Sequence, residues 1–136
     1  MNAIELMEIL GNLNCRFYEI QLEQTISYFQ KMIDDERVIL ISKDKVPYAV
    51  MTFSITNDPD KFLKKGVWDY LPHDPKGTIF YAEKLMAKGW DKELRINFES
   101  LILALYPQIE YGIWHRYGKT GDRQVTTKRR LHNVRD

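Results

Sequence analysis

The sequence predicts a mixed α/β (α+β) fold in a single domain, and three observations lead to it. Residues 37–54 have the pattern of an antiparallel hairpin. Residues 78–116 read as a strand, a long helix and a second strand, a unit that joins parallel strands. A length of 136 residues suits one hydrophobic core and is short for two. We therefore expect a mixed sheet with helices packed against its faces.

Two helices are expected before the hairpin. The first covers residues 3–10 and ends at Gly11, a residue type that commonly terminates helices. The second covers residues 22–34, where apolar residues recur at helical spacing and predict one buried stripe. The members of that stripe are Leu22, Ile26, Phe29 and Ile33.

The hairpin is predicted from two β-branched, apolar runs with a polar turn between them. The runs are "RVILIS" and "PYAVMTFS", and "KDK" separates them. Asp58 as N-cap, Pro59 at the first helical position and Gly66 as terminator then predict a short helix in a long connection. The stretch "DYLPHDPKG" is typical of turns.

The second half should supply the central strand and the longest helix. Residues 78–87 read as the strand, and the helix follows over residues 91–105, where Pro107 stops it. Residues 109–116 return as a strand, with which residues 123–131 could pair. One face of the long helix is expected to be buried, through Leu94, Phe98, Leu101, Ile102 and Leu105.

Composition narrows the class of protein. The hydrophobic fraction is 44% and the charged fraction 29%, and no apolar run approaches the length of a membrane span. The first 20 residues show no secretory signal. A lone cysteine, Cys15, favours a reducing compartment, so we expect the host cytoplasm or a virion.

Positive charge is concentrated at the C-terminal end. Residues 115–136 hold seven Lys or Arg against two Asp, a net charge of +5, so that residues 1–114 sum to −4 in a chain of net charge +1. We divide the chain into a domain of residues 1–117 and a basic strand or tail of residues 118–136. Such an end suits nucleic acid or a protein assembly, although a solvated surface explains it as well. The candidate partner-binding residues are Arg116, Lys119, Arg123, Lys128, Arg129, Arg130 and Arg135.

Two stretches carry a resemblance to a known family. "ILISKDKVPYAVMTFS" resembles the hairpin of the toxin-activating lysine acyltransferases of RTX systems, and "IFYAEKLMAKGW" resembles their "FID-x-IAPFG" strand and loop. These enzymes have the Gcn5-related N-acetyltransferase (GNAT) fold, and the order of elements over residues 2–116 is similar. Uncharacterised phage gene products also look similar. The resemblance implies acyl transfer from acyl-CoA or acyl carrier protein to a lysine amine.

The catalytic residues that the resemblance implies are largely missing. The family has an early histidine, but here no histidine precedes His73, and Cys15 lies where it is expected. Glu83 falls near the family's acidic position. A cysteine nucleophile would need a neighbouring base, and a buried structural thiol accounts for Cys15 more simply. The catalytic candidates are therefore Glu83 and Cys15.

The loop after the central strand is the candidate site for a carrier's phosphates. Ala87, Lys88 and Gly89 are the cofactor-binding candidates, because a glycine lets a phosphate approach backbone N–H groups at a helix N-terminus. Trp90 and Asp91 oppose this role, by bulk and by charge. Asp91 is better explained as the helix N-cap, so we favour a plain strand-helix joint.

Other candidate groups are weaker. His73, His115 and His132 lack metal-ligand spacing, so no metal site is predicted. Asp69, Asp74 and Glu83 could hold a general base if the long loop covers the central strand. Aromatic residues in the second half could stack nucleic-acid bases, although core and sheet packing explains most of them more simply.

The sequence thus leads to a first hypothesis and an alternative. The first is a non-catalytic acyltransferase-like protein of phage type, a virion or assembly component whose basic C-terminus contacts an anionic or protein partner within an oligomer or complex. It needs no cofactor. The alternative is an active N-acyltransferase that uses acyl-CoA or acyl carrier protein.

Overall fold

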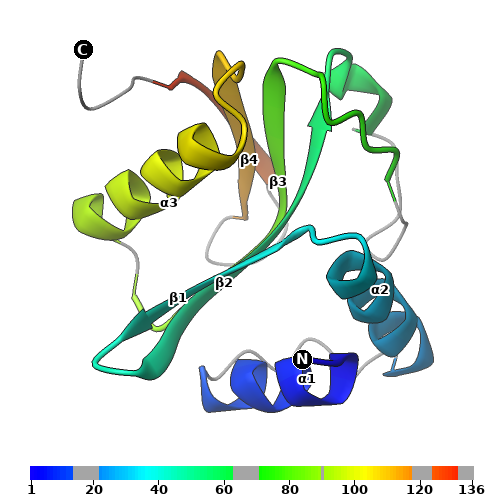
Figure 1. Cartoon of the computed structure of the whole chain (residues 1–136), viewed down its shortest axis with the longest axis vertical. Coiled ribbons are helices and arrows are strands. Elements are labelled where there is room, and N and C mark those ends of the chain that lie inside the picture. The colour runs from blue at the N-terminus through cyan, green and yellow to red at the C-terminus, as the bar shows by residue number, and fades with distance from the viewer. Residues whose placement is uncertain (14–21, 63–70, 90, 118–123, 132–136) are drawn as a thin grey trace.

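The computed structural model describes residues 1–13, 22–62, 71–89, 91–117 and 124–131. It has a five-stranded mixed sheet whose strands lie in chain order, β1 to β5. Helices α1 (Ala3–Asn12) and α2 (Leu22–Asp34) cover one face, and α3 (Lys92–Leu105) covers the other (Figure 1). The predicted mixed sheet with helices on its faces is confirmed. Identity with the GNAT fold stays a prediction.

Strands β1 (Val38–Lys43) and β2 (Val46–Thr56) form the predicted hairpin. Their connection is Asp44 and Lys45, which both have positive φ, 51° and 66°. A two-residue loop of this kind matches the right-handed twist of the flanking strands. The short 3-10 helix η2 (Pro59–Phe62) follows β2, where the sequence predicted a helix starting at Pro59.

Strand β3 (Ile79–Ala87) is antiparallel to β2 and parallel to β4 (Tyr111–Tyr117), with α3 between them in the chain. β5 (Gln124–Arg130) is antiparallel to β4 and forms the edge of the sheet. The basic C-terminal segment therefore contributes a strand to the same sheet, which was one of its two predicted forms.

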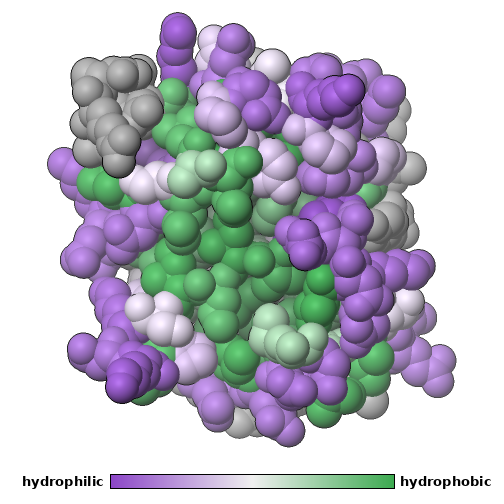
Figure 2. Space-filling model, in the orientation of Figure 1, coloured by the Kyte–Doolittle hydropathy of each residue, from purple (hydrophilic) through white to green (hydrophobic). Residues whose placement is uncertain are grey.

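The core has a layer on each side of the sheet. Under α3, the larger cluster joins Phe53, Phe80 and Phe98. Under α1 and α2, the second cluster joins Leu6, Phe29 and Met32. A band of apolar side chains also lies across the face seen in Figure 2, between the helical layers.

Three details of the predicted helices were wrong. Gly11 lies inside α1, and Leu13 is its C-cap. Among the described side chains of α2, Thr25, Tyr28, Phe29 and Met32 are buried, whereas Ile26 and Ile33 are only partly buried; the side chain of Leu22 is not described. In α3, Leu101 and Leu105 are 41% and 60% exposed. The buried apolar residues of α3 form the narrower stripe of Leu94, Phe98 and Ile102, because helical positions four apart fall on one line.

Candidate functional site

Glu83 lies at a bulge in β3. Thr52 of β2 pairs with Lys84, and the next residue of β2, Phe53, pairs with Ala82, so that Glu83 is the extra residue of β3. A bulge breaks the alternation of side chains between the two faces of a sheet. Glu83 and Lys84 accordingly both reach Tyr28 of α2, the first through a hydrogen bond of 3.0 Å and the second with its ammonium 5.7 Å from the ring centroid.

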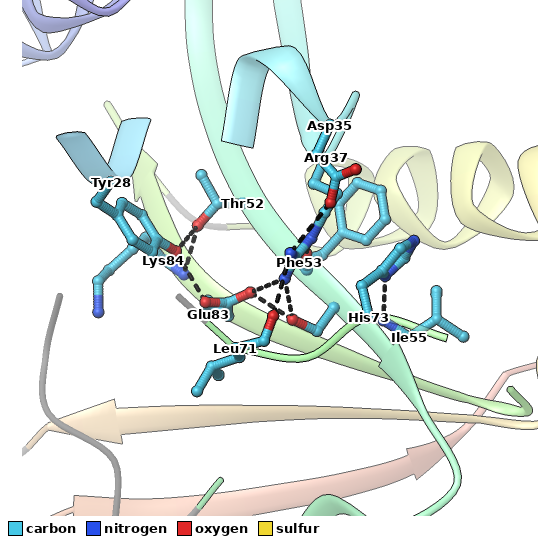
Figure 3. A network of polar contacts seen from close by, with 11 residues as sticks. Tyr28, Asp35, Arg37, Thr52, Phe53, Ile55, Leu71, His73, Glu83 and Lys84 are labelled. Atoms are coloured by element: carbon cyan, nitrogen blue, oxygen red, sulfur yellow. Dashed lines mark hydrogen bonds and ion pairs between the residues drawn. The ribbon is translucent and has the colours of Figure 1, made fainter. Parts of the chain in front are cut away.

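The carboxylate of Glu83 is buried, and both of its oxygens accept hydrogen bonds within the chain. Its side chain is 3% exposed. Oε1 accepts a hydrogen bond from the Tyr28 hydroxyl, and Oε2 accepts one from Ser54 Oγ at 2.6 Å and one from Arg37 Nη2 at 2.9 Å (Figure 3). These bonds supply the partners that a carboxylate needs when it leaves water.

Arg37 is the cation of this network and is the largest fully buried side chain. Besides Glu83, its guanidinium donates to Ser54 Oγ, to the carbonyls of Phe53 (2.8 Å) and Leu71 (3.2 Å), and to Asp35 (3.3 Å). An arginine side chain has five N–H donors. All five therefore have an acceptor in the protein.

The location of Arg37 follows from the unequal lengths of β1 and β2. β1 begins at Val38, while β2 continues past its partner Thr52 to Thr56, so the end of β2 lacks a neighbouring strand on that side. Arg37 satisfies the Phe53 peptide there: its carbonyl accepts from the Phe53 N–H, and its Nε donates to the Phe53 carbonyl. A buried sheet edge needs such partners.

His73 supplies a hydrogen-bond partner to the backbone of β2 in the same way, two residues further along the strand at Ile55. Its Nδ1 accepts the Ile55 N–H at 2.9 Å, and the Asp74 N–H donates to the Ile55 carbonyl at 2.9 Å. The imidazole also contacts the rings of Phe53 and Tyr106 edge to face. Burial and the charge of Arg37 lower the pKa of His73 from its ordinary value. His73 is thus a neutral structural group that closes the edge of β2.

The hydroxyl groups complete the network on the side of α2. Tyr28 and Thr52 share a hydrogen bond of 2.8 Å, and Thr52 Oγ1 also accepts the N–H of Lys84 at 3.2 Å. Because the Tyr28 hydroxyl donates to Glu83, the Thr52 hydroxyl donates to Tyr28. Burial raises the pKa of Tyr28, so its hydroxyl keeps its proton.

The charges of Glu83 and Lys84 are both affected by burial. Burial raises the pKa of the Glu83 carboxyl, and the bond from Ser54 and the charge of Arg37 act in the opposite direction. Burial lowers the pKa of Lys84, and the charge of Glu83 opposes this. A raised carboxyl pKa beside an amine is what a general base would need, but here both carboxylate oxygens already accept hydrogen bonds within the chain.

The candidate phosphate loop has one of its backbone donors, the Lys88 N–H, engaged within the sheet. The N–H of Lys88 donates to the Tyr48 carbonyl at 3.1 Å, and a Cβ at Gly89 would lie 3.2 Å from the Tyr48 hydroxyl. Asp91 is the N-cap of α3, as predicted, and its carboxylate accepts the Leu94 N–H at 2.8 Å. Trp90 lies outside the described residues.

The parallel strands separate next to this loop. β3 and β4 pair only through Ile79–Tyr81 and Tyr111–Ile113, although β3 continues to Ala87 and β4 to Tyr117. A small apolar pocket lies on the α3 side of this separation. It is lined in part by Phe80, Leu85, Phe98 and Trp114. The separation of the strands and the loop at Lys88 thus occupy the same end of β3.

The structure leaves several predicted site residues undescribed. Cys15, Asp69, Lys119, Arg123, His132 and Arg135 lie outside the described residues, and the side chains of Arg116, Lys128 and Arg129 are not described within their strands. Arg130 is exposed at the end of β5. Among the described residues, no group of three or more His, Cys, Asp or Glu could hold a metal ion.

Sequence reasoning identified Glu83 but missed its partners. The sequence predicts Arg37 at the start of one strand and Thr52 and Ser54 within the next, and it gives none of the three a further role. One signal was present: in "VMTFS" the two hydroxyl residues alternate with apolar ones, which places both on one face of the strand.

No family model matches the chain, and no curated protein is significantly similar to it. In the described part of the chain, none of the helices has the length and apolar character needed to cross a membrane.

Proposed function

We propose that the chain is a non-catalytic protein with an acyltransferase-like fold, which binds an anionic or protein partner through its basic C-terminal strand. The observation that carries the proposal is the buried carboxylate of Glu83, whose two oxygens accept three hydrogen bonds within the chain. An acid-base group must exchange protons with a substrate, whereas both oxygens of Glu83 are held by Tyr28, Ser54 and Arg37. Its role is then to neutralise the buried charge of Arg37.

The loop after β3 supports the same proposal. A phosphate seat needs backbone N–H groups that point to solvent. The N–H of Lys88 is bonded to Tyr48, and that of Leu94 is bonded to Asp91. The carboxylate of Asp91 also places a negative charge where a phosphate would bind.

Strand β5 is the feature best suited to a partner. It forms one edge of the sheet and ends in Lys128, Arg129 and Arg130. An edge strand offers backbone groups for pairing, and adjacent basic residues attract phosphate or carboxylate groups. A virion or assembly component of a phage would use such an edge to contact nucleic acid or a neighbouring subunit.

The test is a triple alanine variant of Lys128, Arg129 and Arg130. We expect it to elute from heparin at lower salt than the wild type and to lose binding to single-stranded DNA, with a reduced dependence of binding on salt. A matched control replaces Lys31, Lys61 and Lys76, which lie outside β5. Equal elution of both variants, together with unchanged DNA and protein partners, would refute the proposal.

An active N-acyltransferase is the second candidate, and the separation of β3 from β4 favours it. A carrier's thioester could enter between the separated strands beside Lys88, with the acyl chain directed toward the apolar pocket. Glu83 would take a proton from the acceptor amine, the amine would attack the thioester carbonyl, and the carrier thiol would leave with a proton.

Donor binding distinguishes the two candidates. A specific ligand raises the unfolding temperature by mass action, so acetyl-CoA and acyl carrier protein are each tested at millimolar or the highest soluble concentration by thermal shift and calorimetry. We expect no stabilisation by either. Stabilisation that a Gly89→Trp variant abolishes would instead support the transferase.

A further inference from the structure

We propose that β1 pairs with β1 of a second copy of the chain, in antiparallel orientation, to form a continuous ten-stranded sheet in a two-fold symmetric dimer. β1 is the edge of the sheet opposite β5. Within the described part of the chain, its backbone bonds run to β2 alone. An edge strand with unpaired backbone groups is a template for another strand.

The direction of the backbone groups fixes which residues would pair. The Arg37 carbonyl accepts from Phe53 of β2. Since consecutive residues of a strand point their N–H and C=O to opposite sides, Val38, Leu40 and Ser42 direct theirs away from β2. Antiparallel pairing of these residues with their own copies places Leu40 opposite Leu40 on the two-fold axis, and Val38 opposite Ser42.

Apolar side chains at β1 and its turn are exposed in the single chain, and burial in an interface would remove them from water. Leu40 is 38% exposed at the centre of the strand, and Val46, directly after the turn, is 53% exposed. The apolar band in Figure 2 crosses the face on which Figure 1 places the β1–β2 hairpin. Natural edge strands usually carry a charge or a proline at such a central position, which prevents pairing. β1 has neither between Val38 and Ser42.

The charges at the two ends of β1 favour a second copy of the chain, rather than an unrelated extended strand, as the pairing partner. Asp34, Asp35 and Glu36 precede the strand, Lys43 is its last residue, and Asp44 and Lys45 form the turn after it, so the two ends carry net charges of −3 and +1. In an antiparallel pair the acidic end of one copy lies beside the basic end of the other, and the two-fold axis repeats this contact. Complementary ends therefore favour the antiparallel self-pairing, whereas a parallel arrangement would place like charges together.

The first experiment measures the oligomeric state by sedimentation equilibrium over micromolar to millimolar concentration. We expect the wild type to dimerise, and Leu40→Lys to raise the dissociation constant about 100-fold or more, because each dimer has two copies of the leucine and the new charges meet on the axis. Ile4→Lys is the matched control, since Ile4 is 54% exposed on α1. Circular dichroism confirms that each variant folds.

A charge-exchange experiment tests the orientation of the pair. Glu36→Lys and Lys45→Glu should each weaken dimerisation alone, whereas a mixture of the two variants should form heterodimers at the wild-type concentration. Hydrogen exchange at the amides of Val38, Leu40 and Ser42 should slow as the wild type dimerises. A wild-type monomer at every concentration, or a dimer that Leu40→Lys leaves unchanged, would overturn the proposal.

Discussion

At the scale of single residues, a buried ion pair lies beside the end of β2, where that strand has no neighbour on the side of β1. Arg37 and Glu83 are joined at 2.9 Å, with side chains 0% and 3% exposed. Removing two charges from water costs several kcal/mol, which the surrounding hydrogen bonds offset. The Arg37–Glu83 pair therefore contributes more to the correct arrangement of the segments around it than to the net stability of the fold.

Replacing Glu83 by alanine should lower the free energy of unfolding by about 3–5 kcal/mol, because the Arg37 charge would remain buried without its counter-ion. Urea unfolding measures this loss. Glu93→Ala, in the exposed first turn of α3, should change stability by less than about 1 kcal/mol. A loss for Glu83→Ala no larger than that of the control would show that the network relaxes freely.

His73 should make stability depend on pH below its ordinary pKa of 6.5. Since the folded state lowers the pKa of His73, the unfolded chain takes the proton first, and stability is lost as the pH falls from 7 towards 5. His73→Asn keeps an acceptor for the Ile55 N–H but cannot titrate. As the pH falls, the unfolding temperature of the wild type should therefore decrease more than that of the variant. If the difference between the two unfolding temperatures stayed constant with pH, His73 would not be the source of the pH dependence.

At the scale of elements, two junctions determine where strands and helices end: the turn between β1 and β2, and the cap of α3. Both were predicted in outline, because turn and capping chemistry is local to a few residues. Each can be tested with a single substitution.

Lys45→Gly should raise the free energy of unfolding by about 0.5–1 kcal/mol, because Lys45 holds a φ of 66° that a side chain disfavours and glycine adopts readily. Lys45→Ala is the matched control, which keeps the Cβ and should bring no gain. Thermal unfolding of the two variants gives the comparison, and equal unfolding temperatures would count against a strained turn.

Asp91→Ala should destabilise the protein by about 0.5–2 kcal/mol through loss of the N-cap bond to Leu94. Asp91→Ser should restore most of the loss, since serine can accept the same N–H. If both variants unfolded like the wild type while binding acetyl-CoA more tightly, the residue would act in ligand discrimination and the cap would be incidental.

At the scale of the whole molecule, the sequence predicted the order of elements well and the packing less well. Alternating and helical periods identify strands and helices, but they do not say how wide a stripe the sheet will cover. Leu101 and Leu105 of α3 had the right spacing and still lie in solvent. Glu83 was identified as a candidate site residue from its place in the central strand, whereas its neighbours could not be. Arg37 is buried because β2 continues to Thr56, past Thr52, which pairs with the first residue of β1; no local pattern contains such a relation between strands.

Arg37 also affects how the molecule can open. Its guanidinium is held by β2, β3, the segment before β1 and the Leu71 carbonyl, which come from four separate parts of the chain. Detaching any one of them leaves a cation in an apolar layer with too few acceptors. Partial openings are thereby penalised relative to complete unfolding, so a single arginine makes these four segments separate together.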